Sequence, residues 1–298
     1  MALQHSRRHT SKSARIRVPT PRNPAILLLL YTESSMLDVL KLVKRIVVKV
    51  GSSILVDNQE VAAHRMHELC KFISDLQSKY EVILVTSGAV AAGYTEKEMD
   101  KSSVPNRQAL ASMGQPLLMH MYYTEFKRHG ILCAQMLLAA YDLDSRKRTV
   151  NAHNTIEVLL KEKVIPIINE NDATAFHELV FGDNDRLSAL VAHYFKADLL
   201  VILSDIDGYY TDNPRTSTCA TIRRVVHELS PEELVAEATP NHRFATGGIV
   251  TKLQAAQFLL ERGGQMYLTS GFLLEKAREF LLGGPHEIGT LFYPRASS

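Results

Sequence analysis

The stretch Ile46-Val-Val-Lys-Val-Gly-Ser-Ser53 sets the pattern from which the fold is predicted. It is an apolar run of strand length that ends in a glycine and two hydroxyl residues. Similar runs occur at Val82-Ile-Leu-Val85, 164–168 and 199–203, and each is followed by small or polar residues. Strands that are apolar without alternation are buried on both faces, which is typical of a mainly parallel sheet with helices on either side.

Amphipathic stretches separate these apolar runs. Segments with apolar residues three and four positions apart, the spacing of a helix, are 60–80, 107–127 (where Pro116 predicts a bend), 150–161, 186–196 and 251–262. Shorter extended segments are expected at 131–137 and 265–268. This alternation predicts the α/β class, and specifically one three-layer α/β/α sandwich over residues 41–298.

Charge and composition exclude several classes of function. The chain has 298 residues and a formal net charge of +2, from 34 Lys and Arg against 32 Asp and Glu. Residues 1–40 hold six of the basic residues and two of the acidic ones, so the rest of the chain carries −2 and lacks the basic excess typical of nucleic-acid binding. The apolar run 25–31 is too short to cross a membrane. We therefore expect neither nucleic acid nor a membrane as a partner.

The cysteines indicate a reducing compartment. Cys70, Cys133 and Cys219 lie far apart and form no CxxC motif, so buried free thiols are expected rather than disulfides. We expect a cytoplasmic location. The basic head, residues 1–40, is rich in Arg, Ser and Pro, and three interpretations of it stay open: a disordered segment, a mitochondrial-type presequence, or an over-long start.

Residues with a chemical use follow the predicted strands, at the edge where parallel sheets bind ligands. Gly51, with Ser52 beside it, can present backbone N–H groups to a phosphate. Lys49 stands inside an apolar strand, where an ammonium is costly without an anion, although a lysine at a strand end can also extend to water. The small residues of 86–93 indicate either a second anion-binding turn or a close-packed turn.

Two clusters of carboxylates and amides, Asn169-Glu-Asn-Asp172 and Gly182-Asp-Asn-Asp185, flank the end of one strand and the start of the next helix. Three interpretations of them are open: helix N-caps in solvated turns, a Mg²⁺ site, or recognition of a polar small molecule that carries an amine.

Two later segments are typical of nucleotide binding. Residues 204–215 include Tyr209 and Tyr210, an aromatic pair suited to a nucleobase and ribose, although a simple turn is the alternative. Residues 245–252 place two glycines before a helix whose first turn carries Lys252. A lysine there opposes the helix dipole, so a phosphate partner would explain its position.

The motifs VKVGSS, VTSGAVAAG, ALASMGQ, PIINENDA, GDND, DGYYTDNPR and TGGIVTK, in this order, resemble the amino-acid kinase family over about residues 44–294. The resemblance implies a three-layer sandwich whose first part binds an amino acid and whose later part binds ATP. The sequence is most similar to family members that phosphorylate the γ-carboxylate of L-glutamate to L-glutamyl 5-phosphate, the first step of proline biosynthesis. The alternative is a related kinase acting on another carboxylate, such as N-acetylglutamate or aspartate.

The resemblance also implies roles for individual residues. The catalytic residues would be Lys49 and Lys252, which flank the transferred phosphoryl group, and Asp185, which orients both lysines. The substrate glutamate would be held by Ser87, Asp172 and Asn184. The residues implied to bind ATP share the phosphate turns and the nucleotide side of the sheet: Lys49, Gly51, Ser52, Ser204, Asp205, Thr246, Gly247, Gly248, Ile249, Val250, Thr251 and Lys252.

Further expectations follow from the same resemblance. ATP is the phosphoryl donor, with Mg²⁺ carried by the nucleotide and no separate metal-binding residues. Proline is expected as a feedback inhibitor, a homo-oligomer as the assembly, and a separate glutamyl-phosphate reductase as the consumer of the product. The sequence has neither the C-terminal PUA domain of many bacterial relatives nor the fused reductase of bifunctional ones. Arg107 departs from the lysine that relatives often have on the substrate side.

Overall fold

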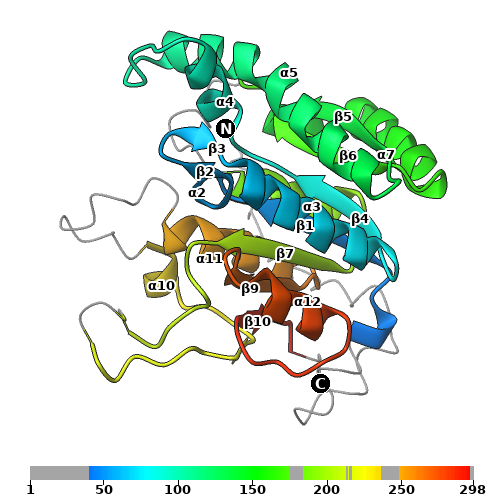
Figure 1. Cartoon of the computed structure of the whole chain (residues 1–298). Coiled ribbons are helices and arrows are strands. Elements are labelled where there is room, and N and C mark those ends of the chain that lie inside the picture. The colour runs from blue at the N-terminus through cyan, green and yellow to red at the C-terminus, as the bar shows by residue number, and fades with distance from the viewer. Residues whose placement is uncertain (1–39, 175–183, 213, 215–216, 236–247, 296–298) are drawn as a thin grey trace, which may run out of the picture.

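The computed structural model describes residues 40–174, 184–212, 214, 217–235 and 248–295. Within these residues, eight strands form one sheet in the order β5-β6-β4-β1-β7-β9-β10-β8 (Figure 1). They are β1 (Arg45–Val50), β4 (Glu81–Val85), β5 (Cys133–Leu138), β6 (Ile165–Glu170), β7 (Leu199–Ser204), β8 (Val225–Val226), β9 (Met266–Ser270) and β10 (Thr290–Phe292). The first six strands of this order, from β5 through β1 to β9, pair in parallel, and β10 runs antiparallel to β9. The predicted α/β class and mainly parallel sheet are confirmed.

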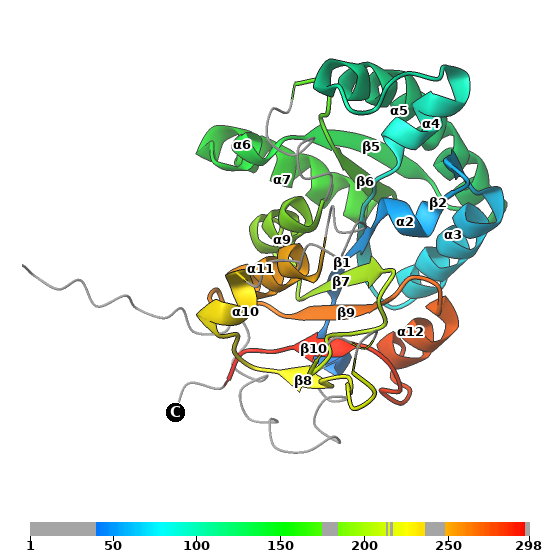
Figure 2. The same ribbon diagram turned by 90° about the vertical axis from the view of Figure 1, so that its left-hand side faces the viewer.

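Helices cover both faces of the sheet, as Figure 2 shows. One face carries α3 (Ala63–Gln77), α5 (Val104–Arg128) and α12 (Leu274–Leu281). The other face carries α7 (Arg146–Lys161), α9 (Asp185–Tyr194) and α11 (Ile249–Leu260). The other described helices are α2 (Ser52–Leu55), α4 (Ala89–Glu96), α6 (Ala140–Leu143) and α10 (Pro231–Val235). Each face of the sheet therefore has its own hydrophobic core, and the three-layer arrangement is confirmed.

The alternation of side chains along β1 decides where its lysine points. Val48 and Val50 belong to the core under α3, α5 and α12, whereas Val47 belongs to the core under α9 and α11. Successive side chains of a strand point to opposite faces, so Lys49 shares the face of Val47. The lysine is thereby directed to the side of the sheet on which α9 and α11 begin.

The order of the strands places a ligand-binding crevice at β1. After β1 the chain builds β4, β5 and β6 on one side, and β7 then pairs with the opposite edge of β1. Such a reversal opens a crevice at the carboxyl ends of the strands, because the connections on either side of it cover opposite faces. Gly51, directly after β1, donates its N–H to the carbonyl oxygen of Leu203 at the end of β7, 3.4 Å away.

The predicted helix at 60–80 starts later than expected. Val56–Asp57 (β2) and Glu60–Val61 (β3) form a two-stranded antiparallel hairpin, and the helix begins at Ala63. Asn58 and Gln59 both have positive φ, of 47° and 71°, which suits a two-residue hairpin turn. The apolar spacing that predicts the helix includes Val61, and this residue pairs in the hairpin instead.

The cysteines follow the prediction only in part. All three are free, and Cys70 is buried, but Cys133 is half-buried and Cys219 is exposed. Burial raises the pKa of the Cys70 thiol above its ordinary value. A search of the described residues finds no helix with the length and apolarity needed to span a membrane.

Helices α4 and α5 approach so closely that glycine is required at their crossing. A Cβ added to Gly114 would lie 1.9 Å from the carbonyl oxygen of Ala89 and 2.2 Å from the nitrogen of Gly93. We expect Gly114→Ala to lower the free energy of unfolding by about 1–3 kcal/mol, because the backbones of both helices must separate to admit the methyl group. Chemical denaturation of the purified variant measures this change.

Ser112→Thr is the matched control for this substitution. It also adds one methyl group to α5, but on the exposed face of the helix. Its denaturation midpoint is expected to stay close to that of the wild type. Equal midpoints for Gly114→Ala and the wild type would show that the two helices are not held in backbone contact.

Candidate active site

A buried carboxylate between two lysines forms the centre of the site. Lys49 Nζ lies 2.6 Å from Asp185 Oδ1, and Lys252 Nζ lies 3.1 Å from Asp185 Oδ2. Thr251 Oγ1 donates to the same Oδ2 at 2.9 Å. The side chains of Lys49, Asp185 and Lys252 are 3%, 0% and 6% exposed. Three residues that span positions 49 to 252 of the chain are thus brought together.

Each member of this centre is placed by the end of a secondary-structure element. Lys49 precedes the last residue of β1, Asp185 is the first residue of α9, and Lys252 lies in the first turn of α11. A carboxylate at a helix N-terminus is favoured by the helix dipole, and it also offsets the lysine that the dipole of α11 disfavours. With two ammonium groups and one carboxylate, the centre carries a net charge of +1 and is suited to an anion.

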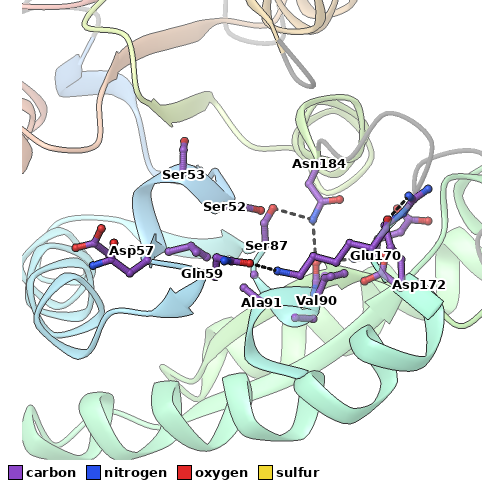
Figure 3. A pocket seen from close by; sticks show the side chains of 17 residues that line it. Ser52, Ser53, Asp57, Gln59, Ser87, Val90, Ala91, Glu170, Asp172 and Asn184 are labelled. Carbon is purple, nitrogen blue, oxygen red and sulfur yellow. Dashed lines mark hydrogen bonds between the residues drawn. The ribbon is translucent and has the colours of Figure 1, made fainter. Parts of the chain in front are cut away.

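The pocket beside this centre has a volume of about 520 Å³ (Figure 3). Ser52 from the start of α2, Ser87 from the end of β4 and Asn184 from the start of α9 line its inner part. Glu170 and Asp172, from the end of β6, lie together at one end of the view in Figure 3. The three predicted substrate residues, Ser87, Asp172 and Asn184, therefore share one pocket.

A chain of buried amides fixes the inner wall of this pocket. Asn184 Nδ2 donates to the carbonyl oxygen of Thr86 at 2.5 Å, to Asn169 Oδ1 at 2.8 Å and to Ser87 Oγ at 3.4 Å. Asn169 Nδ2 in turn donates to Gln115 Oε1 at 2.8 Å. Because the atom of Thr86 in this contact is a carbonyl oxygen, which can only accept, the amide orientation of Asn184 is fixed, and that of Asn169 follows from it.

Gln115 stands inside the quoted motif ALASMGQ, but sequence reasoning gave it no role. Asn169 was considered only as part of the polar cluster 169–172, and its contact with Gln115 was not foreseen. The available signal was a long amide on the buried face of α5, where Gln115 is 8% exposed. Such a group is costly without partners, so it predicts a buried polar network, although not its members.

The turn after β1 has the form expected of a phosphate-binding turn. A Cβ added to Gly51 would lie 3.7 Å from Lys49 Nζ, 3.7 Å from Leu203 O and 3.7 Å from Ser53 Oγ, so the glycine leaves the space next to the lysine open. Gly51 is also the N-cap of α2, and no side-chain hydrogen bond within the described residues caps the start of this helix. The start of α2 thus lies beside the ammonium group of Lys49, although the N–H of Gly51 itself is bonded to Leu203 O.

The same arrangement bears on a metal ion. Asp185 is bound by two lysines and a threonine, so the centre presents cations to a ligand and not a set of carboxylates. Among the described residues, no group of three or more His, Cys, Asp or Glu side chains is placed to hold a metal ion.

Comparison with known proteins agrees with this geometry. The model of the amino acid kinase family matches residues 44–270, which include β1, the pocket, the buried centre and β9. The chain belongs to the amino acid kinase family. Among its relatives, the glutamate 5-kinase of Leishmania donovani is 86% identical over 263 residues, 88% of this chain and 100% of that protein.

Two bacterial relatives carry the same name. The glutamate 5-kinase of Wolinella succinogenes is 64% identical, over 84% of this chain and 97% of that protein. The glutamate 5-kinase of Helicobacter hepaticus is 49% identical, over 85% of this chain and 96% of that protein. These matches extend over most of the chain.

Solved structures show that the fold is that of the family. The UMP kinase from Ureaplasma parvum superposes with a TM-score of 0.57 at 12% identity, over 84% of this chain and 98% of that chain. The isopentenyl phosphate kinase from T. acidophilum, solved as a product complex, superposes with a TM-score of 0.54 at 16% identity, over 84% of this chain and 100% of that chain. At such identities the likeness concerns the fold alone.

Apart from Lys49, Gly51 and Ser52 at the end of β1, the residues predicted to bind ATP in this family member fall into three groups. Thr246 and Gly247 lie outside the described residues. Gly248 is the N-cap of α11 and leads into Ile249 and Val250, while Thr251 and Lys252 contact Asp185. Ser204 is buried at the end of β7 and donates to Oδ1 of the exposed Asp205 at 3.1 Å. The assignment of these residues to ATP stays a prediction.

The aromatic pair after β7 is packed within the kinase fold. The ring of Tyr209 stacks on Phe292 with centroids 6.2 Å apart, and the Arg223 guanidinium lies 5.0 Å from its centroid. Its hydroxyl donates to Glu233 Oε1 at 2.6 Å, and burial with this contact raises the pKa of Tyr209 to about 12. Tyr210 donates to Asp207. The ring and the hydroxyl of Tyr209 thus both contact neighbours from this chain, and its role as a platform for a nucleobase stays a prediction.

Proposed function

We propose that this chain is an ATP-dependent kinase that phosphorylates the γ-carboxylate of L-glutamate, the reaction that opens proline biosynthesis. The observation that carries the proposal is the 86% identity, over the whole length of that relative, to a glutamate 5-kinase. The buried Lys49–Asp185–Lys252 centre next to a polar pocket supports it, because this is the arrangement that phosphoryl transfer to an anion requires.

The chemistry needs cations and positioning more than it needs a base. A γ-carboxylate has a pKa of about 4.3, so it is ionised at neutral pH and can attack directly. The barrier arises from bringing one anion onto another and from charge that spreads over the moving phosphoryl group. We assign that charge to the ammonium groups of Lys49 and Lys252, which Asp185 holds at fixed positions.

The two substrates approach this centre from different sides. Ser87, Asn184 and Asp172 line the pocket and would hold the glutamate, with its γ-carboxylate toward Asp185 and the lysines. The turn at Gly51 and the start of α11 would take the phosphates of ATP. Mg²⁺, which supplies further neutralisation of the phosphates when bound, would enter with the nucleotide.

Several expectations stay proposals of the same kind. We place the enzyme in the cytoplasm, as a homo-oligomer inhibited by proline. The acyl phosphate product is labile, so a separate reductase would consume it. The catalytic domain would span residues 41–298, preceded by the basic head.

A panel of carboxylates tests the substrate. Release of ADP from Mg-ATP is measured with L-glutamate, N-acetyl-L-glutamate and L-aspartate. The proposal expects saturable release with L-glutamate and rates near the background with the other two. Faster release with N-acetylglutamate or aspartate would replace the proposal with the alternative, a related kinase for another carboxylate.

Asp172 is expected to bind the substrate and not to act in the transfer. Asp172→Ala should raise the KM for L-glutamate by about tenfold or more, because a hydrogen bond to a charged group is lost, while kcat changes little. Steady-state kinetics at saturating Mg-ATP measures both constants. Glu68→Gln, which alters an exposed carboxylate on α3, is the control. An unchanged KM in Asp172→Ala would remove this residue from the substrate site.

A further inference from the structure

Arg107 is a half-buried cation that lines the pocket from the first turn of α5. Its Nη1 donates to the carbonyl oxygen of Lys101 at 2.7 Å and to that of Ser102 at 3.2 Å. Its Nε is buried and has no hydrogen-bond partner in the part of the chain that the structure describes. Nη1 is therefore anchored by backbone, whereas neither Nε nor Nη2 has a hydrogen-bond partner among the described residues.

This placement is unfavourable for folding in two ways. A cation in the first turn of a helix opposes the helix dipole, and α5 has no acidic residue in that turn to offset it. A buried N–H without an acceptor also loses its hydrogen bond to water. Local rules that are broken without compensation within the fold are typical of functional positions.

The surroundings of Arg107 suit the polar end of an amino acid. Lys101 also lines the pocket, but its ammonium group donates to Gln59 Oε1 at 3.1 Å and lies 3.4 Å from the centroid of the Tyr94 ring. Burial lowers the pKa of Lys101. Asp172 lines the same pocket. The pocket therefore offers an acid, Asp172, for an amine, and a guanidinium, Arg107, for a carboxylate.

We propose that Arg107 binds the α-carboxylate of the amino-acid substrate with its guanidinium group and makes the enzyme select substrates with a free α-carboxylate. The inference rests on the proposed glutamate kinase activity. The planar edge of a guanidinium matches the two oxygens of a carboxylate, and the two backbone carbonyls hold that edge in place before the substrate arrives. The γ-carboxylate is then the end left to face the lysine centre.

The test compares two substrates that differ at the α-carboxylate alone. L-Glutamic acid α-amide keeps the γ-carboxylate and the α-amine, and has a neutral amide in place of the α-carboxylate. The kcat/KM of both compounds is measured by trapping the acyl phosphate, and the Kd of both by calorimetry, for the wild type and Arg107→Met. Arg107→Lys is the conservative variant, and Arg128→Met removes a positive charge from the exposed end of the same helix.

The expected result is a loss of discrimination. Arg107→Met should lower the kcat/KM for L-glutamate, and raise its Kd, by about tenfold to a hundredfold, the range for one charge-assisted contact. For the α-amide, both constants should stay within about twofold of their wild-type values. Arg107→Lys should retain part of the preference for glutamate, and Arg128→Met all of it. The Kd values give the comparison if the α-amide is bound without being phosphorylated.

Two results would overturn the inference. An equal loss for both compounds in Arg107→Met would mean that the side chain only anchors the loop before α5, and an unchanged preference would mean that it does not contact the α-carboxylate. Failure of the proposed function looks different, because wild-type protein would then show no glutamate-dependent turnover at all.

Discussion

Asp185→Asn is expected to lower kcat by about a thousandfold and to destabilise the protein by about 3–5 kcal/mol. The carboxylate is fully buried, and its two oxygens lie 2.6 Å from Lys49 Nζ and 3.1 Å from Lys252 Nζ. An asparagine removes the negative charge that both buried ammonium groups contact. They repel each other, lose protons or move toward water, and in each case the phosphoryl group loses its fixed cations.

Both effects of this substitution are measurable on the same sample. Release of ADP under saturating substrates gives kcat, and chemical denaturation gives the free energy of unfolding. Thr251→Val serves as a comparison, because it removes a single hydrogen bond to Asp185 and keeps the carboxylate with both lysines. Its loss in kcat should be at least about tenfold smaller. A kcat within tenfold of the wild type for Asp185→Asn would refute the role of the carboxylate.

Lys49→Met and Lys252→Met are each expected to lower kcat by about a hundredfold or more while the KM for L-glutamate changes far less. Removing one preorganised donor at the position where charge develops costs a factor of this size. Methionine has a similar length and suits a buried site, so the fold should survive. In either variant Asp185 keeps one lysine as its partner, which limits the loss of stability compared with Asp185→Asn.

The control for the lysine variants is Lys161→Met. Lys161 is the exposed last residue of α7, and its substitution removes the same charge without touching the centre. Near-normal turnover of either Lys49→Met or Lys252→Met would show that the two ammonium groups are not the cations that stabilise the transferred phosphoryl group.

Much of the fold follows from apolar runs that are short and unbroken. The runs at β1, β4, β6 and β7 predict parallel strands because a strand buried on both faces has no polar alternation. The two-residue strand β8 and the three-residue strand β10 carry no such signal and depend on pairing with distant partners. The predicted start of α3 is too early for a related reason. Val61 has the apolar spacing of a helix, but the turn at Asn58 and Gln59 pairs it with Val56 in a hairpin.

The candidate site divides in a similar way. Lys49 and Lys252 drew attention because each breaks a local rule, one inside an apolar strand and one against a helix dipole, whereas Asp185, an acid favoured at a helix start, was singled out by the family resemblance. The contacts of Gln115 with Asn169, and of Asn169 with Asn184, join α5, β6 and the start of α9. No spacing in one sequence indicates which of several amides meet across three elements. The partners of Tyr209 are hidden for the same reason, because Phe292 lies far along the chain.

The central claim is that this site transfers a phosphoryl group from ATP to the γ-carboxylate of L-glutamate. The most direct test incubates the purified protein with Mg-ATP, L-glutamate and hydroxylamine, and identifies the hydroxamate by mass spectrometry with fragmentation. The account predicts L-glutamate γ-hydroxamate in amounts equal to the ADP released, and little of either from Asp185→Asn. No hydroxamate, or a hydroxamate at the α-carboxyl group, would contradict it.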